Sequence, residues 1–312
     1  MQILDNRSLR FVVFFSFLPL VLLVFSVLSF NDNDINFIEM TSSPVIYDVS
    51  GDSSYLSDFI KSKGVGSVFN LAQEGDPYAV YARGVLKFGN ISSEVSRNLA
   101  SAIEDVESSW RLGVVDAGYK LFELYFDGVG VDKNYELALY YLKSSAEFGY
   151  LKSQRYLGVA YSGLAGHGLV QENAERAKYW FERAATNGDK LSTKNLAILY
   201  YDGAADERDK NMSFEIALSV ESKPYGDDMV GLDTLAFFYE KGIGTDINVV
   251  QAYKYYDLLS PGSAPDKARL EEKMTPEQIR EAIRLSRQWQ EEHNIFVPSY
   301  YGLEYQEDGS FQ

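Results

Sequence analysis

A glycine recurs at nearly constant intervals along most of the chain, and this period constrains the fold more than any other feature. The successive intervals are 38, 36, 39, 38 and 36 residues. Periods of this length are typical of repeat proteins, in which each repeat is one supersecondary unit that stacks on its neighbours. The glycines that end the units are Gly75, Gly113, Gly149, Gly188, Gly226 and Gly262.

Within each unit the apolar residues follow a helical spacing. A first segment carries an apolar residue, an aromatic residue four positions later and a glycine three beyond, as in Leu121, Tyr125 and Gly128. A second segment carries an alanine with a large residue three further on, as in Ala177 and Trp180. Residues three or four apart share one helical face, and a small residue beside a large one lets two helices pack closely. The pattern therefore predicts about five units of two helices each.

Several stretches resemble a known repeat family. YLGVAYSG, ERAKYWFERAATNG, LFELYFDGVGVDKNYELALYYLKSSAEFG and FFYEKGIGTDINVVQAYKYY are similar to Sel-like repeats, which are related to tetratricopeptide repeats. The resemblance runs from about Asp76 to the C-terminal helix, and a partial unit begins near Tyr55. It implies an all-α fold, a right-handed α-solenoid. The fourth unit departs from the family at Ser222, Lys223 and Pro224, where two alanines are usual, and the proline is expected to end that helix early.

A closing helix is predicted after the last repeat, because Thr275, Pro276 and Gln278 supply an N-cap, an N1 proline and a glutamine at N3. We expect this helix to cap the array. The predicted organisation is a cytoplasmic segment 1–10, a membrane segment 11–30, a linker 31–54, a repeat array 55–274, a capping helix 275–293 and a tail 294–312.

The segment 11–30 contains no charged residue and as a helix would span roughly 30 Å of hydrocarbon. Arg7 and Arg10 precede it, and Asp32 and Asp34 follow it, so the rest of the chain should be exported. Its length favours an uncleaved anchor in the bacterial inner membrane, with a periplasmic C-terminal domain. Cleavage as a signal peptide, which would give a periplasmic or secreted chain, stays open.

Composition excludes several functions. The net charge of −16 disfavours nucleic-acid binding and favours a basic protein partner. The chain has no cysteine and only two histidines, His167 and His293, which stand far apart in sequence. Thiolate and multi-histidine metal sites are therefore not expected. We predict no catalytic residue, no cofactor and no metal.

Some aromatic residues exceed what the packing positions of the repeats require. They adjoin core aromatics and should point partly away from the core, where amphipathic rings suit an interface. The alternative, that they pack between neighbouring repeats, is equally open. With two acidic residues, the candidate partner-binding set is Tyr140, Tyr179, Tyr201, Asp227, Asp228, Phe238 and Tyr256.

The sequence therefore predicts a non-catalytic scaffold or adaptor of the bacterial envelope, which binds a protein on the concave face of the solenoid. The resemblance leaves two alternatives open. One is a periplasmic immunity protein that neutralises a phospholipase toxin of type VI secretion. The other is a hydrolase, which fits poorly because the relatives assigned that activity carry cysteines that this chain lacks.

Overall fold

A computed structural model describes residues 37–89, 95–166, 168–203 and 206–297. These residues belong to one compact unit. The predicted membrane segment 11–30 and His167 lie outside them. Within the described ranges the regular structure is entirely helical apart from two isolated β-bridges, so the predicted all-α class is confirmed.

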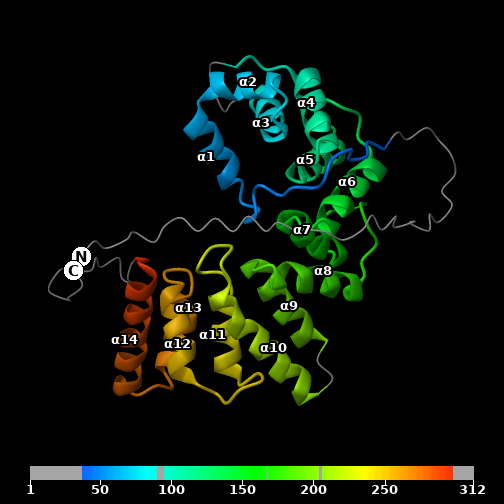
Figure 1. Cartoon of the computed structure of the whole chain (residues 1–312). Coiled ribbons are helices and arrows are strands. Elements are labelled where there is room, and N and C mark those ends of the chain that lie inside the picture. The colour runs from blue at the N-terminus through cyan, green and yellow to red at the C-terminus, as the bar shows by residue number, and fades with distance from the viewer. Residues whose placement is uncertain (1–36, 90–94, 167, 204–205, 298–312) are drawn as a thin grey trace, which may run out of the picture. The chain divides into compact units, whose positions relative to one another are not determined.

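The helices pack as antiparallel pairs that follow one another along the chain (Figure 1). The second helix of each pair also contacts the first helix of the next pair, which is the arrangement of an α-solenoid. In chain order the helices are α1 (Ser54–Lys63), α2 (Val65–Gln73), α3 (Pro77–Lys87), α4 (Leu99–Arg111), α5 (Asp116–Asp127), α6 (Tyr135–Glu147), α7 (Leu151–Tyr161), α8 (Ala174–Thr186), α9 (Lys190–Asp202), α10 (Glu207–Ser219), the 3-10 helix η1 (Val220–Ser222), α11 (Leu232–Lys241), α12 (Val249–Leu258), α13 (Ala264–Glu271) and α14 (Pro276–His293).

Four of the six periodic glycines end a second helix and start the next unit, whereas Gly226 follows the 3-10 helix η1 and Gly262 lies beyond α12 without a positive φ. Gly75, Gly113, Gly149 and Gly188 have φ between 90° and 100°, a left-handed conformation that costs glycine little. At Gly113 the N–H donates to the carbonyl of Trp110, and the N–H of Val114 donates to Ser109, which is a Schellman end. Gly75, Gly149 and Gly188 show the same pattern, so four consecutive junctions share one backbone geometry.

A short polar side chain begins most second helices. Asn98, Asn134, Asn173 and Asn248 stand at the N-caps of α4, α6, α8 and α12, and each side chain accepts a hydrogen bond from a backbone N–H in the first turn. Asp206 does the same for α10. Such caps satisfy N–H groups that have no partner within the helix. The asparagines thus fix where each second helix begins.

The core is continuous through α3–α9 and then passes to a second cluster in α9–α14, with Ile216 packed against both. The boundary between the two core clusters lies in the fourth unit, α9–α10, which is also the unit that departs from the family pattern. α10 ends at Ser219, a single 3-10 turn follows, and Lys223 before Pro224 is extended. The helix therefore ends before Pro224, as predicted, although its 13 residues equal those of α4, α6 and α8.

The predicted capping helix is present as α14. The Thr275 side chain accepts from the Gln278 N–H, and the Gln278 side chain accepts from the Thr275 N–H, which completes a capping box. Its buried face carries Ala282 and Trp289, which pack into the second core cluster, and α14 contacts α12. The helix therefore covers the end of the array, as a solenoid cap must.

In the part of the chain that the structure describes, no helix combines the length and apolar character needed to cross a membrane.

Gly158, in the middle of α7, lies where α7 packs closely on α8, and its replacement tests this packing. A Cβ added at Gly158 would lie 2.4 Å from Cδ1 of Phe181, whose ring is buried in α8. We expect Gly158→Ala to lower the free energy of unfolding by about 1–3 kcal/mol, because the buried ring cannot move aside. Urea unfolding followed by circular dichroism measures the change.

Gly66→Ala is the matched control, since Gly66 lies in α2 and an added Cβ meets nothing within 4 Å. Replacing a helical glycine by alanine in open space stabilises by up to about 1 kcal/mol. If both variants moved the stability in the same direction, the close packing of α7 on α8 would be wrong.

Candidate interaction surface

Residues 37–53, which we call the strap, precede α1 and pack against the repeats α4–α7 without forming a helix (Figure 1). At the start of the strap the ring of Phe37 lies 4.6 Å from that of Tyr140 in α6. The indole N–H of Trp110 in α4 donates to the Ile38 carbonyl at 2.7 Å. This part of the predicted linker is therefore bound to the array.

The middle of the strap is held by its backbone. The N–H of Thr41 donates to the carbonyl of Arg111 at 2.8 Å. The N–H of Val45 donates to the carbonyl of Gly113 at 2.8 Å, and its carbonyl accepts from Val115 at 3.0 Å. These two bonds form a parallel β-bridge between the strap and the junction that joins α4 to α5.

A buried carboxylate holds the next two residues. Asp116, the first residue of α5, is 2% exposed and accepts hydrogen bonds from the N–H groups of Tyr47 and Asp48 at 3.0 and 2.8 Å. Burial raises the pKa of Asp116 to about 6, although these two bonds favour the ionised form. Asp116 therefore acts as a clamp on the strap.

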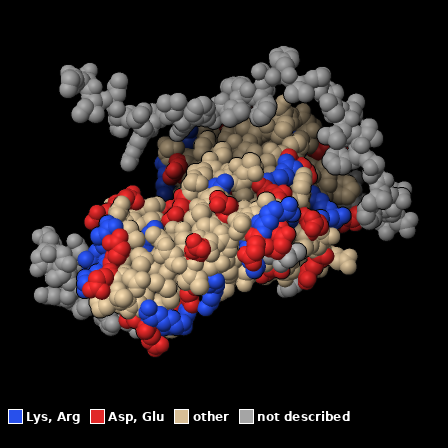
Figure 2. All heavy atoms as spheres, turned by 90° about the horizontal axis from the view of Figure 1, so that it is seen from below, with Lys and Arg blue, Asp and Glu red and all other residues tan. Residues whose placement is uncertain are grey.

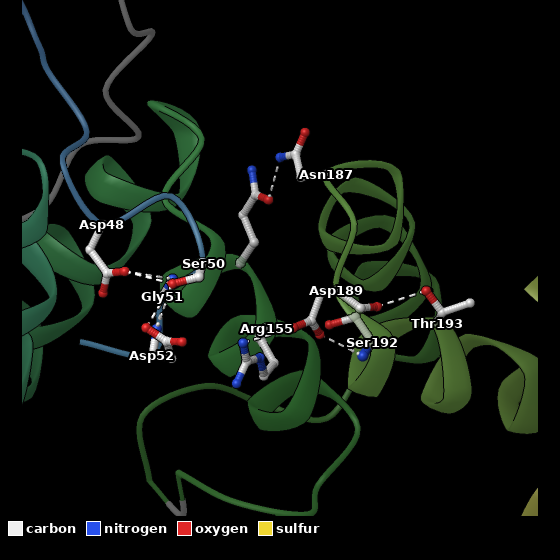
Figure 3. Close-up of polar contacts among 10 residues, drawn as sticks. Asp48, Ser50, Gly51, Asp52, Arg155, Asn187, Asp189, Ser192 and Thr193 are labelled. Atoms are coloured by element: carbon white, nitrogen blue, oxygen red, sulfur yellow. Dashed lines mark hydrogen bonds and ion pairs between the residues drawn. The ribbon is translucent and has the colours of Figure 1, made fainter. Parts of the chain in front are cut away.

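The strap ends in a turn organised by a second buried carboxylate (Figure 3). Asp48 accepts from the hydroxyl of Ser50 at 2.8 Å and from the N–H groups of Gly51 and Ser53 at 3.2 and 2.7 Å. Gly51 approaches α7 so closely that an added Cβ would lie 3.0 Å from the backbone nitrogen of Lys152. The strap therefore extends from α6 across the α4–α5 junction to the start of α7.

An exposed tyrosine on α8 is held by its neighbours in a group that we call the Tyr179 cluster: Tyr179, buried Trp180 and Arg183 of α8, and Glu147 of α6. The Tyr179 ring is 45% exposed and meets Trp180 edge to face at 5.0 Å. Arg183 donates to the Tyr179 hydroxyl at 2.8 Å and pairs with Glu147 of α6 at 2.7 Å. A rigid, half-exposed aromatic ring beside an arginine has the composition of an interface hot spot.

The seven predicted residues do not form one surface. Tyr140 lies against the strap, Tyr179 is open, and Tyr201 is half-buried beside Phe237 at 6.1 Å. Asp227 is exposed and accepts from the Met229 N–H, whereas Asp228 forms an ion pair with Lys190.

Phe238 and Tyr256 are corrections to the sequence analysis, because they are 1% and 7% exposed and offer no contact surface. The Tyr256 hydroxyl donates to Glu240. Both faces of α12 are covered, since it packs against α11 on one side and α14 on another. Adjacent Tyr255 and Tyr256 of α12 are therefore both buried, which a single helical stripe does not predict.

Many carboxylates are paired within the protein rather than free for a partner. Arg155 contacts buried Asp189 at 2.7 Å, and Asp189 also accepts from the Ser192 N–H (Figure 3). Lys194 pairs with Asp233 at 2.7 Å. Figure 2 shows acidic and basic side chains intermingled over the face it draws. Among the described residues no group of three His, Cys, Asp or Glu side chains is placed to hold a metal ion.

Sequence reasoning missed the strap and its clamp. Asp116 follows two valines at the start of a helix, where an acidic residue is favoured in any protein and signals nothing special. Its burial depends on residues almost seventy positions earlier in the chain. No local pattern could have paired them.

Comparisons with known proteins agree with the fold. The family model "Sel1 repeat" matches residues 115–150, 151–189 and 235–259. These segments cover α5–α8 and most of α11–α12, and they leave out the fourth unit, which contains Pro224. The resemblance to Sel-like repeats is thereby confirmed.

Curated relatives and a solved structure are also similar. The yeast (Saccharomyces cerevisiae) chitin synthase regulator SKT5 is 27% identical over 62% of this chain, which spans 29% of that protein. The Arabidopsis thaliana ERAD-associated E3 ubiquitin-protein ligase component HRD3B is 32% identical over 30% of this chain and 14% of its own length. A Sel1 repeat protein from Oxalobacter formigenes superposes with a TM-score of 0.57 at 20% identity, covering 75% of this chain and 98% of that one.

The raised pKa of Asp116 generates a pH dependence. An ordinary aspartate titrates at 3.8, so the folded chain binds this proton more tightly than the unfolded chain does. The contribution of Asp116 to stability is therefore complete below about pH 4 and is lost as the pH rises through about 6, by on the order of 3 kcal/mol. Raising the pH over this range should weaken the fold around the strap.

Asp116→Asn isolates this effect, because the amide does not titrate while all other groups stay the same. We expect the difference in unfolding free energy, wild type minus variant, to fall between pH 4 and pH 7 in urea titrations. A difference that increased with pH would show that the fold favours the ionised carboxylate, contrary to a raised pKa of Asp116.

Proposed function

Since this chain carries Sel1 repeats, we propose that it is a non-catalytic scaffold that binds a protein partner. The observation that carries this proposal is the Tyr179 cluster, where an aromatic ring is fixed by Arg183 yet remains 45% exposed on a repeat helix. A half-exposed aromatic ring held in one orientation beside an arginine has the composition of an interface anchor. The names of the two curated relatives, a regulator and a component of a larger complex, agree with this role.

We further propose that the scaffold works in the bacterial envelope. The uncharged segment 11–30, with Arg7 and Arg10 before it, supports export of the array and attachment to the inner membrane. Neutralisation of a phospholipase toxin is an alternative with the same topology, and the identity of the partner distinguishes the two roles. Hydrolysis is the least supported alternative.

The proposed partner is basic, because the chain has a net charge of −16. To test whether negative charge attracts the partner, Asp227 is a better residue to replace by lysine than Asp228. Asp228 neutralises Lys190, which is 4% exposed, so reversing its charge would place two cations together and disturb the fold. Asp227→Lys instead reverses an exposed charge that accepts a hydrogen bond from the Met229 N–H.

Photo-cross-linking tests the partner surface. An unnatural benzoyl-phenylalanine replaces Tyr179 in one chain and Tyr135 in another, since these rings are 45% and 44% exposed but Tyr135 lies outside the cluster. We expect one protein to be cross-linked at position 179 and not at 135. Tyr179→Ala should then weaken binding of that protein by about 2 kcal/mol, or roughly thirtyfold, mainly through faster dissociation.

Cross-linking at 135 alone, or a Tyr179→Ala variant that binds as tightly as wild type, would contradict the assignment of this cluster. If the partner is basic, its association should slow as salt rises and should slow further with Asp227→Lys. Surface plasmon resonance at several salt concentrations measures both rates.

Fusions test the topology. Alkaline phosphatase, which needs export for activity, is expected to be active when joined after Asn31 or after Gln312, and green fluorescent protein at the same points should stay dark. The reverse pattern at both points would place the array in the cytoplasm and refute the envelope proposal while leaving the scaffold proposal intact.

A further inference from the structure

The same backbone bridge occurs twice in this chain, at equivalent junctions between repeats. At the α4–α5 junction, Val45 donates its N–H to the Gly113 carbonyl and accepts from the Val115 N–H. At the α8–α9 junction, Tyr225 donates to the Gly188 carbonyl at 3.1 Å and accepts from the Lys190 N–H at 2.9 Å. Both bridges are parallel, and both use the carbonyl of the glycine and the N–H two residues later.

This repetition identifies a property of the junction rather than of the residue that binds it. The Schellman end leaves the glycine carbonyl without a helical partner, and the next helix begins with an N–H that has none either. The pair of groups can therefore receive one residue of any extended chain, as a sheet edge does. Valine and tyrosine share no side-chain chemistry, and they bind the two junctions in the same register.

The strap is held by these backbone contacts and by Ile38, Met40 and Tyr47, which are partly buried and pack against the core of the repeats, while other apolar strap side chains stay exposed. Phe37, Val45 and Val49 remain 43%, 45% and 56% exposed. A hydrogen bond exchanged with water stabilises by only about 1 kcal/mol, so a ligand that made the same backbone bonds and buried more apolar surface would compete with the strap. The repeats α4–α7, in contrast, have buried apolar cores of their own.

Removing the strap would expose a surface prepared for another extended chain. The Trp110 indole N–H, the Gly113 carbonyl, the Val115 N–H and the Asp116 carboxylate would all lose partners at once. A partner that supplied the same backbone groups would recover these bonds.

We propose that the strap is an internal ligand, and that it occupies a docking surface for an extended segment of a protein partner. That segment places an aromatic or apolar side chain on Tyr140, one residue on the Gly113–Val115 backbone and two consecutive N–H groups on Asp116. Binding requires displacement of the strap, which is therefore autoinhibitory. The proposal rests on the proposed scaffold function only in that the partner is a protein.

The experiment uses the full chain in two forms, the wild type and a variant in which residues 37–47 are replaced by glycine and serine at the same length. Asp48 is kept because it organises the turn before α1. The probe is a fluorescein-labelled peptide with the sequence of residues 37–48, and its binding is followed by fluorescence anisotropy. We expect the peptide to bind the variant at least tenfold more tightly than it binds wild type, whose own strap competes.

Two altered peptides separate backbone from side-chain recognition. Val45→Pro removes the N–H that bonds to Gly113 and should weaken binding to the variant at least tenfold. Val45→Ala keeps that N–H and removes a half-exposed side chain, so it should bind within about threefold of the parent. Asp116→Asn in the strap-replaced chain should weaken binding of the parent peptide.

Any of three results would overturn the proposal. The first is a peptide that binds neither chain, and the second is a peptide that binds both equally. The third is a strap-replaced chain that fails to fold by circular dichroism, which would make the strap an integral part of the array. No outside partner enters this test, so it is independent of the cross-linking at position 179.

Discussion

The left-handed glycine at the end of α2, α4, α6 and α8 is the constraint on which the stacking of the repeats depends. Only a residue that adopts positive φ at little cost lets the chain leave one helix and enter the next within a few residues. Four successive junctions, at Gly75, Gly113, Gly149 and Gly188, share this geometry. Because the turn is the same each time, the following helix starts in the same relation to the preceding one, and the repeats stack.

The same turn has a second consequence that concerns binding. It exposes one carbonyl and one N–H at the boundary between repeats, and the chain itself fills two of these positions with Val45 and Tyr225. The Gly75 junction cannot form this bridge because Pro77 has no N–H. At the Gly149 junction no described backbone group pairs in this way. The backbone geometry of the junctions therefore leaves a carbonyl and an N–H between repeats that can bind an extended chain.

The Tyr179 cluster differs in the kind of partner it suits from the surface that the strap covers, which we call the strap surface. The Tyr179 cluster offers side chains, a ring held by Arg183 and Glu147, and suits a folded partner. The strap surface offers mainly backbone groups and the Asp116 carboxylate, and suits an extended segment. Tyr140 and Tyr179 stand nine residues before Gly149 and Gly188 respectively, so they occupy one repeat position. The strap covers the first and leaves the second open.

The sequence by itself determined the helical pairs, the place where each unit ends, the end of α10 before Pro224 and the capping box of α14. Each of these follows from local chemistry: the φ of glycine, the missing N–H of proline, and side-chain caps within three residues. The tertiary structure alone decided which surface aromatics are free. Phe238 and Tyr256 are buried because α11, α12 and α14 pack around them, and Tyr140 is covered because residues distant in sequence fold back onto α6. The burial of Asp116 under the strap has the same cause, since a contact between residues almost seventy positions apart leaves no periodic trace in a sequence.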